Sequence, residues 1–326
     1  MIKFENKNLN PFNIISEKDF KEKAITLFKY QFKNNLIYNQ YCNLLKIKSK
    51  DIIELHQIPF LPIQFFKTHK IVSSKKKITH IFKSSGTTGV KSKNHVNDIN
   101  MYIKSFRKSF EIFYGPIEDY IFLGLLPSYL EQKNSSLIFM VDNFIKTSSF
   151  NESAFYLNNT KQLSNTLKKV KYKKIILFGV SYALLDFAEK YPIKMRNLIV
   201  IETGGMKGRK KEISRDELHQ RLQSGFGVEN IHSEYGMTEL FSQAYAIKDG
   251  KFKNPPWMKT FIRDINNPLF VSKKGKGAIN IIDLANKHSC AFIATEDLGE
   301  VFENNNYSII GRMTESEIRG CNQMFN

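Results

Sequence analysis

Cysteine is scarce in this sequence, and long apolar runs are missing from it. The three cysteines, Cys42, Cys290 and Cys321, are spread over the chain. Their spacing excludes a disulfide framework and the close Cys and His pairs of a structural metal site, so we expect free thiols. No run approaches the roughly 20 apolar residues of a membrane-spanning helix. The first residues carry charges with no apolar segment behind them, unlike a secretion signal. The sequence therefore predicts a cytoplasmic protein without a membrane span.

Acidic residues are also few. The chain has 31 Asp and Glu against 49 Lys and Arg, which gives a net charge of +18. Such a charge suits an anionic partner such as nucleic acid. However, the excess consists mainly of lysines spread along the chain, and no known nucleic-acid-binding motif accompanies it. We therefore attribute the charge to a compositional bias and expect no nucleic-acid partner.

The composition and the hydrophobic pattern predict a folded α/β protein. Hydrophobic residues make up 42% of the chain and aromatic residues 13%, which excludes a disordered protein. Apolar runs of strand length alternate with longer amphipathic stretches, as in an α/β fold. Ser16, a typical capping residue followed by acids, predicts a helix start, and a second helix is expected over residues 36–47. The expected strands cover residues 78–82, 120–126, 174–179 and 197–201.

The pattern changes after about residue 240. Pro and Gly residues now interrupt shorter runs of β-branched and aromatic residues, which predicts a β-rich part. Its strands are expected over residues 257–263, 278–284, 290–294 and 307–310. We therefore expect an α/β core over residues 1–240, a β-rich subdomain of the same fold over residues 241–312, and a short tail over residues 313–326 that carries Cys321.

A first candidate site lies in residues 82–91, FKSSGTTGVK, between a predicted strand and a predicted helix. Two glycines let the backbone approach a ligand closely, and the hydroxyls and amides can surround the oxygens of a polyphosphate. The segment is not a P-loop, because the Gly-Lys-Ser/Thr ending is missing. A plain flexible turn stays an alternative. The candidate phosphate-binding residues are Ser84, Ser85, Gly86, Thr87, Thr88, Gly89 and Lys91.

A second candidate site lies in residues 232–239, HSEYGMTE, after a short predicted strand. An aromatic ring can stack on a base, a hydroxyl can meet a phosphate oxygen, and Glu239 can hold Mg²⁺ while phosphates fill the other coordination positions. The alternative is a tight turn into a helix, with Glu239 favouring the positive end of the helix dipole. His232 is expected at the wall of this site, and His95 is expected to be structural. The candidate nucleotide contacts are Tyr235, Gly236, Met237 and Thr238.

These two motifs, in this order, resemble those of the adenylate-forming superfamily of acyl-CoA synthetases, luciferases and peptide-synthetase adenylation domains. The resemblance implies the large N-terminal domain of that fold, with ATP and Mg²⁺ as cofactors and with Thr88, Lys91 and Glu239 in catalysis. Three weaker matches follow, each of which is also common as plain structure. Residues 202–205, ETGG, resemble the lining of the adenine pocket, Asp297 the aspartate that binds ribose, and Arg312 the hinge arginine that reaches nucleotide oxygens. The implied contacts are Gly204, Gly205, Asp297 and Arg312.

The end of the chain departs from the superfamily pattern. Ordinary members continue past the hinge with a C-terminal domain that carries a catalytic lysine, whereas 14 residues follow Arg312 here. We therefore expect that domain to be lacking. This ending resembles the LuxE-type acyl-protein synthetases, which activate a fatty acid for the bacterial bioluminescence reductase complex and carry it on a cysteine near the C-terminus. Cys321, in residues 318–321, IRGC, matches that cysteine. Residues 61–67 and 126–130 are also similar to that family.

The resemblance implies ATP-dependent activation of a carboxylic acid, expected to be a fatty acid, to acyl-AMP. The acyl group would then move to Cys321 and onward to a protein partner such as an acyl reductase or a carrier. Two alternatives stay open. The first is a ligase or acyltransferase with a diffusible acceptor such as coenzyme A, for example in polysaccharide modification, with Cys321 incidental. The second is a nucleotide-binding module without turnover.

Overall fold

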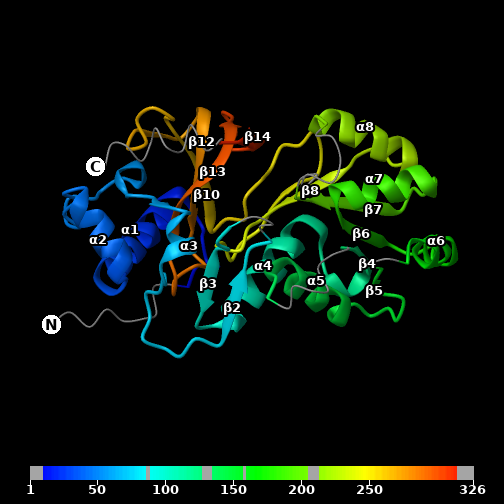
Figure 1. Cartoon of the computed structure of the whole chain (residues 1–326), viewed down its shortest axis with the longest axis horizontal. Helices are drawn as coiled ribbons and strands as arrows, with labels where there is room; N and C mark the ends of the chain where they lie inside the picture. The colour runs from blue at the N-terminus through cyan, green and yellow to red at the C-terminus, as the bar shows by residue number, and fades with distance from the viewer. Residues whose placement is uncertain (1–9, 86–88, 127–133, 157–158, 205–212, 314–326) are drawn as a thin grey trace. The chain divides into compact units, whose positions relative to one another are not determined.

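The computed structural model describes residues 10–85, 89–126, 134–156, 159–204 and 213–313 (Figure 1). The chain divides into two compact units. The first unit comprises residues 1–105, 238–242 and 253–326, and the second comprises residues 106–237 and 243–252. This division differs from the expected boundary near residue 240, because residues 1–105 group with the β-rich part. Among the described residues, no helix is both long enough and apolar enough to span a membrane.

The second unit is built on a mainly parallel sheet. Its strand order is β5 (Ala154–Phe155), β4 (Ile121–Leu125), β6 (Ile175–Val180), β7 (Leu198–Thr203), β8 (His232–Tyr235) and β9 (Ala244–Ala246), and only the β8–β9 pair is antiparallel. Every residue of β4 and β6 is buried. Continuous apolar runs of this kind are typical of parallel strands that are covered on both faces.

Helices of the second unit connect these strands. They are α5 (Ser136–Thr147), α6 (Thr160–Lys169), α7 (Ser181–Lys190) and α8 (Arg215–Phe226), and α4 (Ile99–Tyr114) enters the unit at residue 106. The helices α7 and α8 lie side by side (Figure 1). The expected strands over residues 120–126, 174–179 and 197–201 are confirmed. The carboxyl ends of parallel strands lie at the same edge of a sheet. The residues that follow β7 and β8 therefore lie at one edge.

The first unit contains a mixed sheet. Its strand order is β1 (Leu61–Pro62), β13 (Phe292–Val301), β12 (Gly275–Asp283), β10 (Met258–Arg263) and β11 (Val271–Ser272), and β14 (Tyr307–Arg312) also pairs with β13. Only β1 runs parallel to its neighbour. The four strands expected after residue 257 are confirmed. A separate antiparallel pair is formed by β2 (His80–Lys83) and β3 (Lys93–Val96).

The N-terminal helices also belong to the first unit. They are α1 (Glu17–Asn34), α2 (Leu36–Leu44) and the short α3 (Phe65–Thr68). Ser16 caps α1 as expected, because its hydroxyl accepts a hydrogen bond from the Asp19 amide. The helix expected over residues 36–47 ends earlier, at Leu44, since Lys46 has a left-handed backbone with φ of 57°.

One local expectation was wrong, and one alternative is excluded. The segment with the first motif joins the antiparallel strands β2 and β3 rather than a strand and a helix, and α4 begins only at Ile99. The second motif does not lead into a helix either. Its first four residues form β8, and a turn then leads to β9. A helix dipole therefore does not explain Glu239.

Candidate active site

The segment Thr238–Ser242 belongs to the first unit, whereas the residues that precede and follow it in the sequence belong to the second. Its backbone is held by side chains from distant parts of the sequence. The Asn94 amide donates to the carbonyl of Thr238 at 2.9 Å, and the Asn286 amide donates to the carbonyl of Glu239 at 2.6 Å. All of these side chains are buried. Two buried amides thus fix the peptide groups around Glu239.

Asp283 holds the other end of the same segment. Its carboxylate accepts hydrogen bonds from the amides of Phe241 at 2.7 Å and Ser242 at 3.0 Å, and from the Ser242 hydroxyl at 2.6 Å. The Trp257 indole donates to the same hydroxyl at 2.9 Å. Because Asp283 is fully buried, each of these bonds replaces a lost hydrogen bond to water. The direction of the chain after Glu239 therefore depends on Asp283.

The Glu239 carboxyl itself is buried, with 4% of the residue exposed. Burial raises its pKa, while a hydrogen bond from Ser92 and the charge of Arg312 act in the opposite direction and Glu296 adds to the increase. Ser92 and Asn94 are two residues apart in extended chain, so both side chains point to the same face and both reach this segment. Hydrogen bonds therefore fix both the backbone and the side chain of Glu239, so its buried carboxyl has a defined position for binding a ligand.

Ser84, at the base of the first motif, is connected to Glu239 through Ser92. The Ser84 amide donates to the Ser92 carbonyl, and the Ser92 amide donates to the Ser84 hydroxyl, both at 3.1 Å. Gly89 has φ of 79°, which favours glycine, and Lys91 is exposed. Within one unit, the structure thus brings the ends of the phosphate-loop candidate next to Glu239. The predicted residues Gly86, Thr87 and Thr88 lie outside the described part of the chain.

Two further predicted residues meet across β13 and β14. Asp297 and Arg312 are direct partners in the register of this pair. Arg312 also donates from Nη2 to Glu296 Oε2 at 2.9 Å. Since Arg312 and Glu296 both act on the pKa of Glu239, the two strands approach the Glu239 segment. The first unit therefore gathers Ser84, Glu239, Asp297 and Arg312.

Gly204, Tyr235, Gly236 and Met237 lie at the carboxyl edge of the parallel sheet in the second unit. Gly204 follows β7 with φ of 68°, and its carbonyl accepts a hydrogen bond from Ser181 at 2.5 Å. Tyr235 ends β8, and its ring lies 5.7 Å from that of Phe252. Gly236 follows, where a Cβ atom would lie 2.4 Å from the Glu234 carboxyl oxygen, so a larger residue would have to displace that side chain. Met237 belongs to the same unit, and Gly205 lies outside the described residues.

Two buried acids stand just before these residues, and the sequence patterns did not indicate them. Burial raises the pKa of Glu234 to about 7, partly offset by a 2.6 Å hydrogen bond from the Thr203 hydroxyl. Burial also opposes ionisation of Glu202, but His219 at 3.6 Å and Arg215 at 3.9 Å outweigh it, and the pKa of Glu202 is lowered. One charged and one titratable carboxyl therefore lie on the neighbouring strands β7 and β8, on opposite faces of the sheet.

Burial lowers the pKa values of the two histidines singled out in the sequence, His232 and His95. Burial lowers the pKa of His232 to about 4, and its ring stacks on Tyr114, whose hydroxyl lies 3.1 Å from Nδ1. Burial and two lysines lower the pKa of His95, which is half-buried on β3. Both rings are therefore neutral at pH 7.

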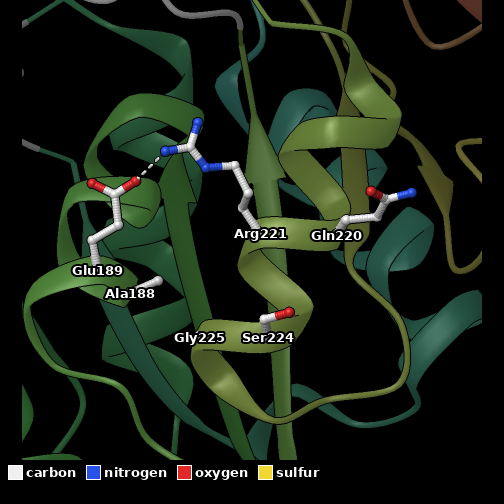
Figure 2. A pocket seen from close by; sticks show the side chains of 6 residues that line it. All are labelled: Ala188, Glu189, Gln220, Arg221, Ser224 and Gly225. Carbon is white, nitrogen blue, oxygen red and sulfur yellow. Dashed lines mark hydrogen bonds and ion pairs between the residues drawn. The ribbon is translucent and has the colours of Figure 1, made fainter.

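A shallow depression of about 450 Å³ lies between α7 and α8, and none of the predicted site residues lines it (Figure 2). Arg221 crosses it to form an ion pair with Glu189 at 2.6 Å. The other lining residues are Ala188, Gln220, Ser224 and Gly225.

Comparison with known proteins identifies the family. The sequence model of the family described as "Acyl-protein synthetase, LuxE" matches residues 8–326. The chain belongs to the acyl-protein synthetase family. It is therefore an AMP-forming ligase, which uses ATP to activate a carboxylic acid as acyl-AMP. The resemblance inferred from the two motifs is confirmed.

Curated relatives of this acyl-protein synthetase agree. The long-chain-fatty-acid–luciferin-component ligase of Aliivibrio fischeri is 22% identical over 333 residues, which cover 94% of this chain and 87% of that protein. The ligase of the same name from Photorhabdus luminescens is 35% identical over 77 residues, which cover 23% of this chain and 66% of that protein.

Solved structures confirm the adenylate-forming fold of this synthetase. 2-Hydroxyisobutyryl-CoA ligase, in complex with its acyl-AMP, has a TM-score of 0.68 at 14% identity and is matched over 91% of this chain and 67% of its own. ATP-bound MatB of Rhodopseudomonas palustris has a TM-score of 0.56 at 14% identity, over 73% of this chain and 49% of its own. The chain thus spans about half to two thirds of these two proteins. At such identities the likeness shows the fold alone.

Proposed function

We propose that this synthetase adenylates a fatty acid, carries the acyl group as a thioester on Cys321, and delivers it to a partner protein. The observation that carries the proposal is the group within the first unit, where the base of the phosphate-loop candidate, Glu239 and Arg312 come together. The names of the curated relatives support a long-chain fatty acid as substrate. An acyl reductase or an acyl carrier is the kind of partner that would accept a thioester.

In the first step, a carboxylate oxygen of the acid attacks the α-phosphorus of ATP. The new oxygen–phosphorus bond forms as the bond to the β-phosphate oxygen breaks, and pyrophosphate leaves with that electron pair. Both reactants are anions, so fixed cations and donors must offset their repulsion. We assign this role to Thr88, Lys91 and Arg312. Ser84, Ser85, Gly86, Thr87 and Gly89 would surround the phosphates.

The donor set fits Mg²⁺ shared with the phosphates. Mg²⁺ usually takes one or two carboxylates and completes its shell with water and substrate phosphates. Glu239 supplies a buried carboxyl for this role. In the part of the chain that the structure describes, no three acidic, His or Cys side chains form a cage. When bound, the ion would neutralise phosphate charge, and Glu239 would hold it.

The nucleoside contacts follow from the motifs. We assign the base and sugar to residues that are small, aromatic or acidic at strand ends, each as a proposal. A tyrosine can stack on adenine, and an aspartate can accept hydrogen bonds from ribose hydroxyls. The assigned residues are Gly204, Gly205, Tyr235, Gly236, Met237, Thr238 and Asp297.

Cysteine burial supports Cys321 as the acyl acceptor. Cys42 and Cys290 are both fully buried. Burial raises the pKa of Cys42 to about 12 and that of Cys290 still higher. Since the thiolate is the nucleophile, neither can compete at neutral pH. Cys321 itself lies outside the described residues. Its thiolate would attack the acyl carbon, form the carbon–sulfur bond and expel AMP.

The test is incubation of the purified protein with Mg-ATP and labelled carboxylic acids, followed by intact-mass and peptide analysis before and after neutral hydroxylamine. We expect an acyl mass on Cys321 that hydroxylamine removes. The Cys321→Ala variant should lose the adduct but keep acid-dependent exchange of pyrophosphate into ATP. Absence of that exchange in the unmodified protein would contradict the first step.

A diffusible acceptor is the second candidate function. It is favoured by a solved structural neighbour, 2-hydroxyisobutyryl-CoA ligase, whose complex contains coenzyme A together with the acyl-AMP. If AMP and pyrophosphate form without a protein adduct, and coenzyme A speeds AMP release, this reading replaces the thioester on Cys321.

A further inference from the structure

Glu296 occupies a special position on the edge of β13. On this edge β1 pairs with Ile293 and Ala294, whereas β14 pairs with residues 297–301. The Ile63 amide donates to the Ala294 carbonyl at 2.9 Å, and the Met313 amide donates to the Glu296 carbonyl at 2.8 Å. Glu296 therefore lies between two segments that come from opposite ends of the chain.

Each of these segments brings one cation to the Glu296 carboxyl. Lys67, on α3 directly after β1, has its ammonium 3.7 Å from Oε1, and Arg312 on β14 lies 2.9 Å from Oε2. The Glu296 side chain is 11% exposed, whereas Lys67 is 40% and Arg312 65% exposed. The carboxyl is thus covered, and both cations extend from it toward solvent.

One carboxylate cannot use all the donors of these cations. A lysine ammonium has three N–H groups and an arginine guanidinium has five. The group also includes Glu239, because Arg312 and Glu296 act on its pKa in opposite directions. Both cations keep N–H groups that Glu296 does not use, so an arriving polyphosphate can bind them. Ion pairs this exposed contribute little on their own.

The position of Lys67 comes from the fold of its own segment. Phe66 is fully buried and anchors α3, and the Lys67 amide donates to the Gln64 carbonyl. The strand β1, which precedes α3, pairs with β13 next to Glu296. This pairing places Lys67 beside Glu296, which is distant in the sequence. A lysine presented in this way is a point charge for phosphate.

We propose that Lys67 binds phosphate oxygens of the nucleotide together with Arg312, and that Glu296 holds both cations in place until the nucleotide replaces it. The inference rests on the proposed function, because it needs phosphates beside Arg312 and Glu239. It adds a residue from the first part of the chain to the phosphate site, and it gives Glu296 the role of a competing anion.

The experiment is calorimetric titration with Mg-α,β-methylene-ATP, whose α–β bridge the acid cannot cleave. Loss of a charged phosphate contact in Lys67→Ala should weaken binding about tenfold or more, and Lys67→Gln, which keeps the stem, should do the same. Lys67→Arg should stay within about threefold, since it keeps the charge. Glu296→Gln should strengthen binding about twofold to fivefold, because it removes the competing anion.

Lys274→Ala is the matched control, because Lys274 also pairs with a glutamate, Glu303, in the first unit and is similarly exposed. It should bind as the unmodified protein does. Unchanged binding by Lys67→Ala, or weaker binding by Glu296→Gln, would overturn the inference. If the unmodified protein binds the analogue but shows no acid-dependent pyrophosphate exchange, the proposed function fails while the variants still decide the role of Lys67. If the unmodified protein does not bind the analogue, both fail.

Discussion

Replacing Glu234 by glutamine should change how the stability of the protein depends on pH. Glu234 is buried on β8, and the Thr203 hydroxyl donates to its Oε2 at 2.6 Å. Burial, with repulsion from Glu202, raises the pKa of Glu234 from 4.5 to about 7. Glutamine resembles the protonated carboxyl in shape, and its amide oxygen can accept the same hydrogen bond. The variant therefore removes the titration and keeps the packing.

The magnitude follows from the two pKa values. Between pH 4.5 and about 7, the unfolded chain loses this proton while the folded chain keeps it, so stability falls as the pH rises. At about 1.4 kcal/mol per pH unit, the loss between pH 5 and pH 8 is about 2.5 kcal/mol. Glutamine has no such proton. The free energy of unfolding of the variant, relative to the unmodified protein, should therefore rise by this amount over the same interval.

His232 acts in the opposite direction in both proteins. Burial lowers its pKa from 6.5 to about 4, so the unfolded chain binds a proton that the folded chain does not, and stability rises with pH between these values. In the unmodified protein the two contributions oppose each other and give a flatter profile below pH 6.5, whereas the stability of the variant should rise with pH there. Only the difference between the two proteins isolates Glu234.

The assay is urea unfolding at several pH values, followed by far-ultraviolet circular dichroism. Trp257 fluorescence serves as a second signal, because this buried tryptophan reports on the first unit. Glu189→Gln, which removes an exposed carboxyl from the second unit, is the control and should not reproduce the change. A constant difference between Glu234→Gln and the unmodified protein from pH 5 to pH 8 would refute the reasoning.

Three further variants test the site. Glu239→Gln should lower acid-dependent pyrophosphate exchange about 100-fold, because a magnesium ligand is lost, and full exchange at every Mg²⁺ concentration would exclude this role. Cys321→Ser should leave exchange within about threefold and abolish the hydroxylamine-sensitive acyl mass, and an adduct elsewhere would reject the thioester assignment. Asp283→Asn places an amide donor against the backbone amide of either Phe241 or Ala285, whichever way the carboxamide turns, so we expect a loss of about 1–3 kcal/mol in urea unfolding. It should also lower kcat about tenfold with little change in KM for the acid. Tyr38→Phe, which loses a buried hydrogen bond to Pro59, is its control and should keep kcat.

Local patterns predicted most elements of the fold. Ser16 indicated the start of α1, and apolar runs indicated β4, β6 and β7, because capping and continuous burial depend on residues close in sequence. The failures occurred where partners are distant. The hairpin of β2 and β3 around the first motif was taken for a strand and a helix, since nothing within residues 82–96 shows that two short strands pair. The grouping of residues 1–105 with the β-rich sheet has the same cause, because β1 pairs with β13.

The sequence by itself determined the family and the candidate residues, because motif chemistry is local. Residues 84–91 and 235–239 keep residue types suited to phosphate, base and metal in an order that identifies an adenylate-forming enzyme. Only the tertiary structure decided which side chains support them. Asn94, Asp283 and Asn286 carry no signal as single polar residues, yet they hold the Glu239 segment through buried hydrogen bonds. Lys67 likewise reaches Glu296 only through the pairing of β1 with β13, and such hydrogen-bond partners are chosen by the folded backbone, not by neighbours in sequence.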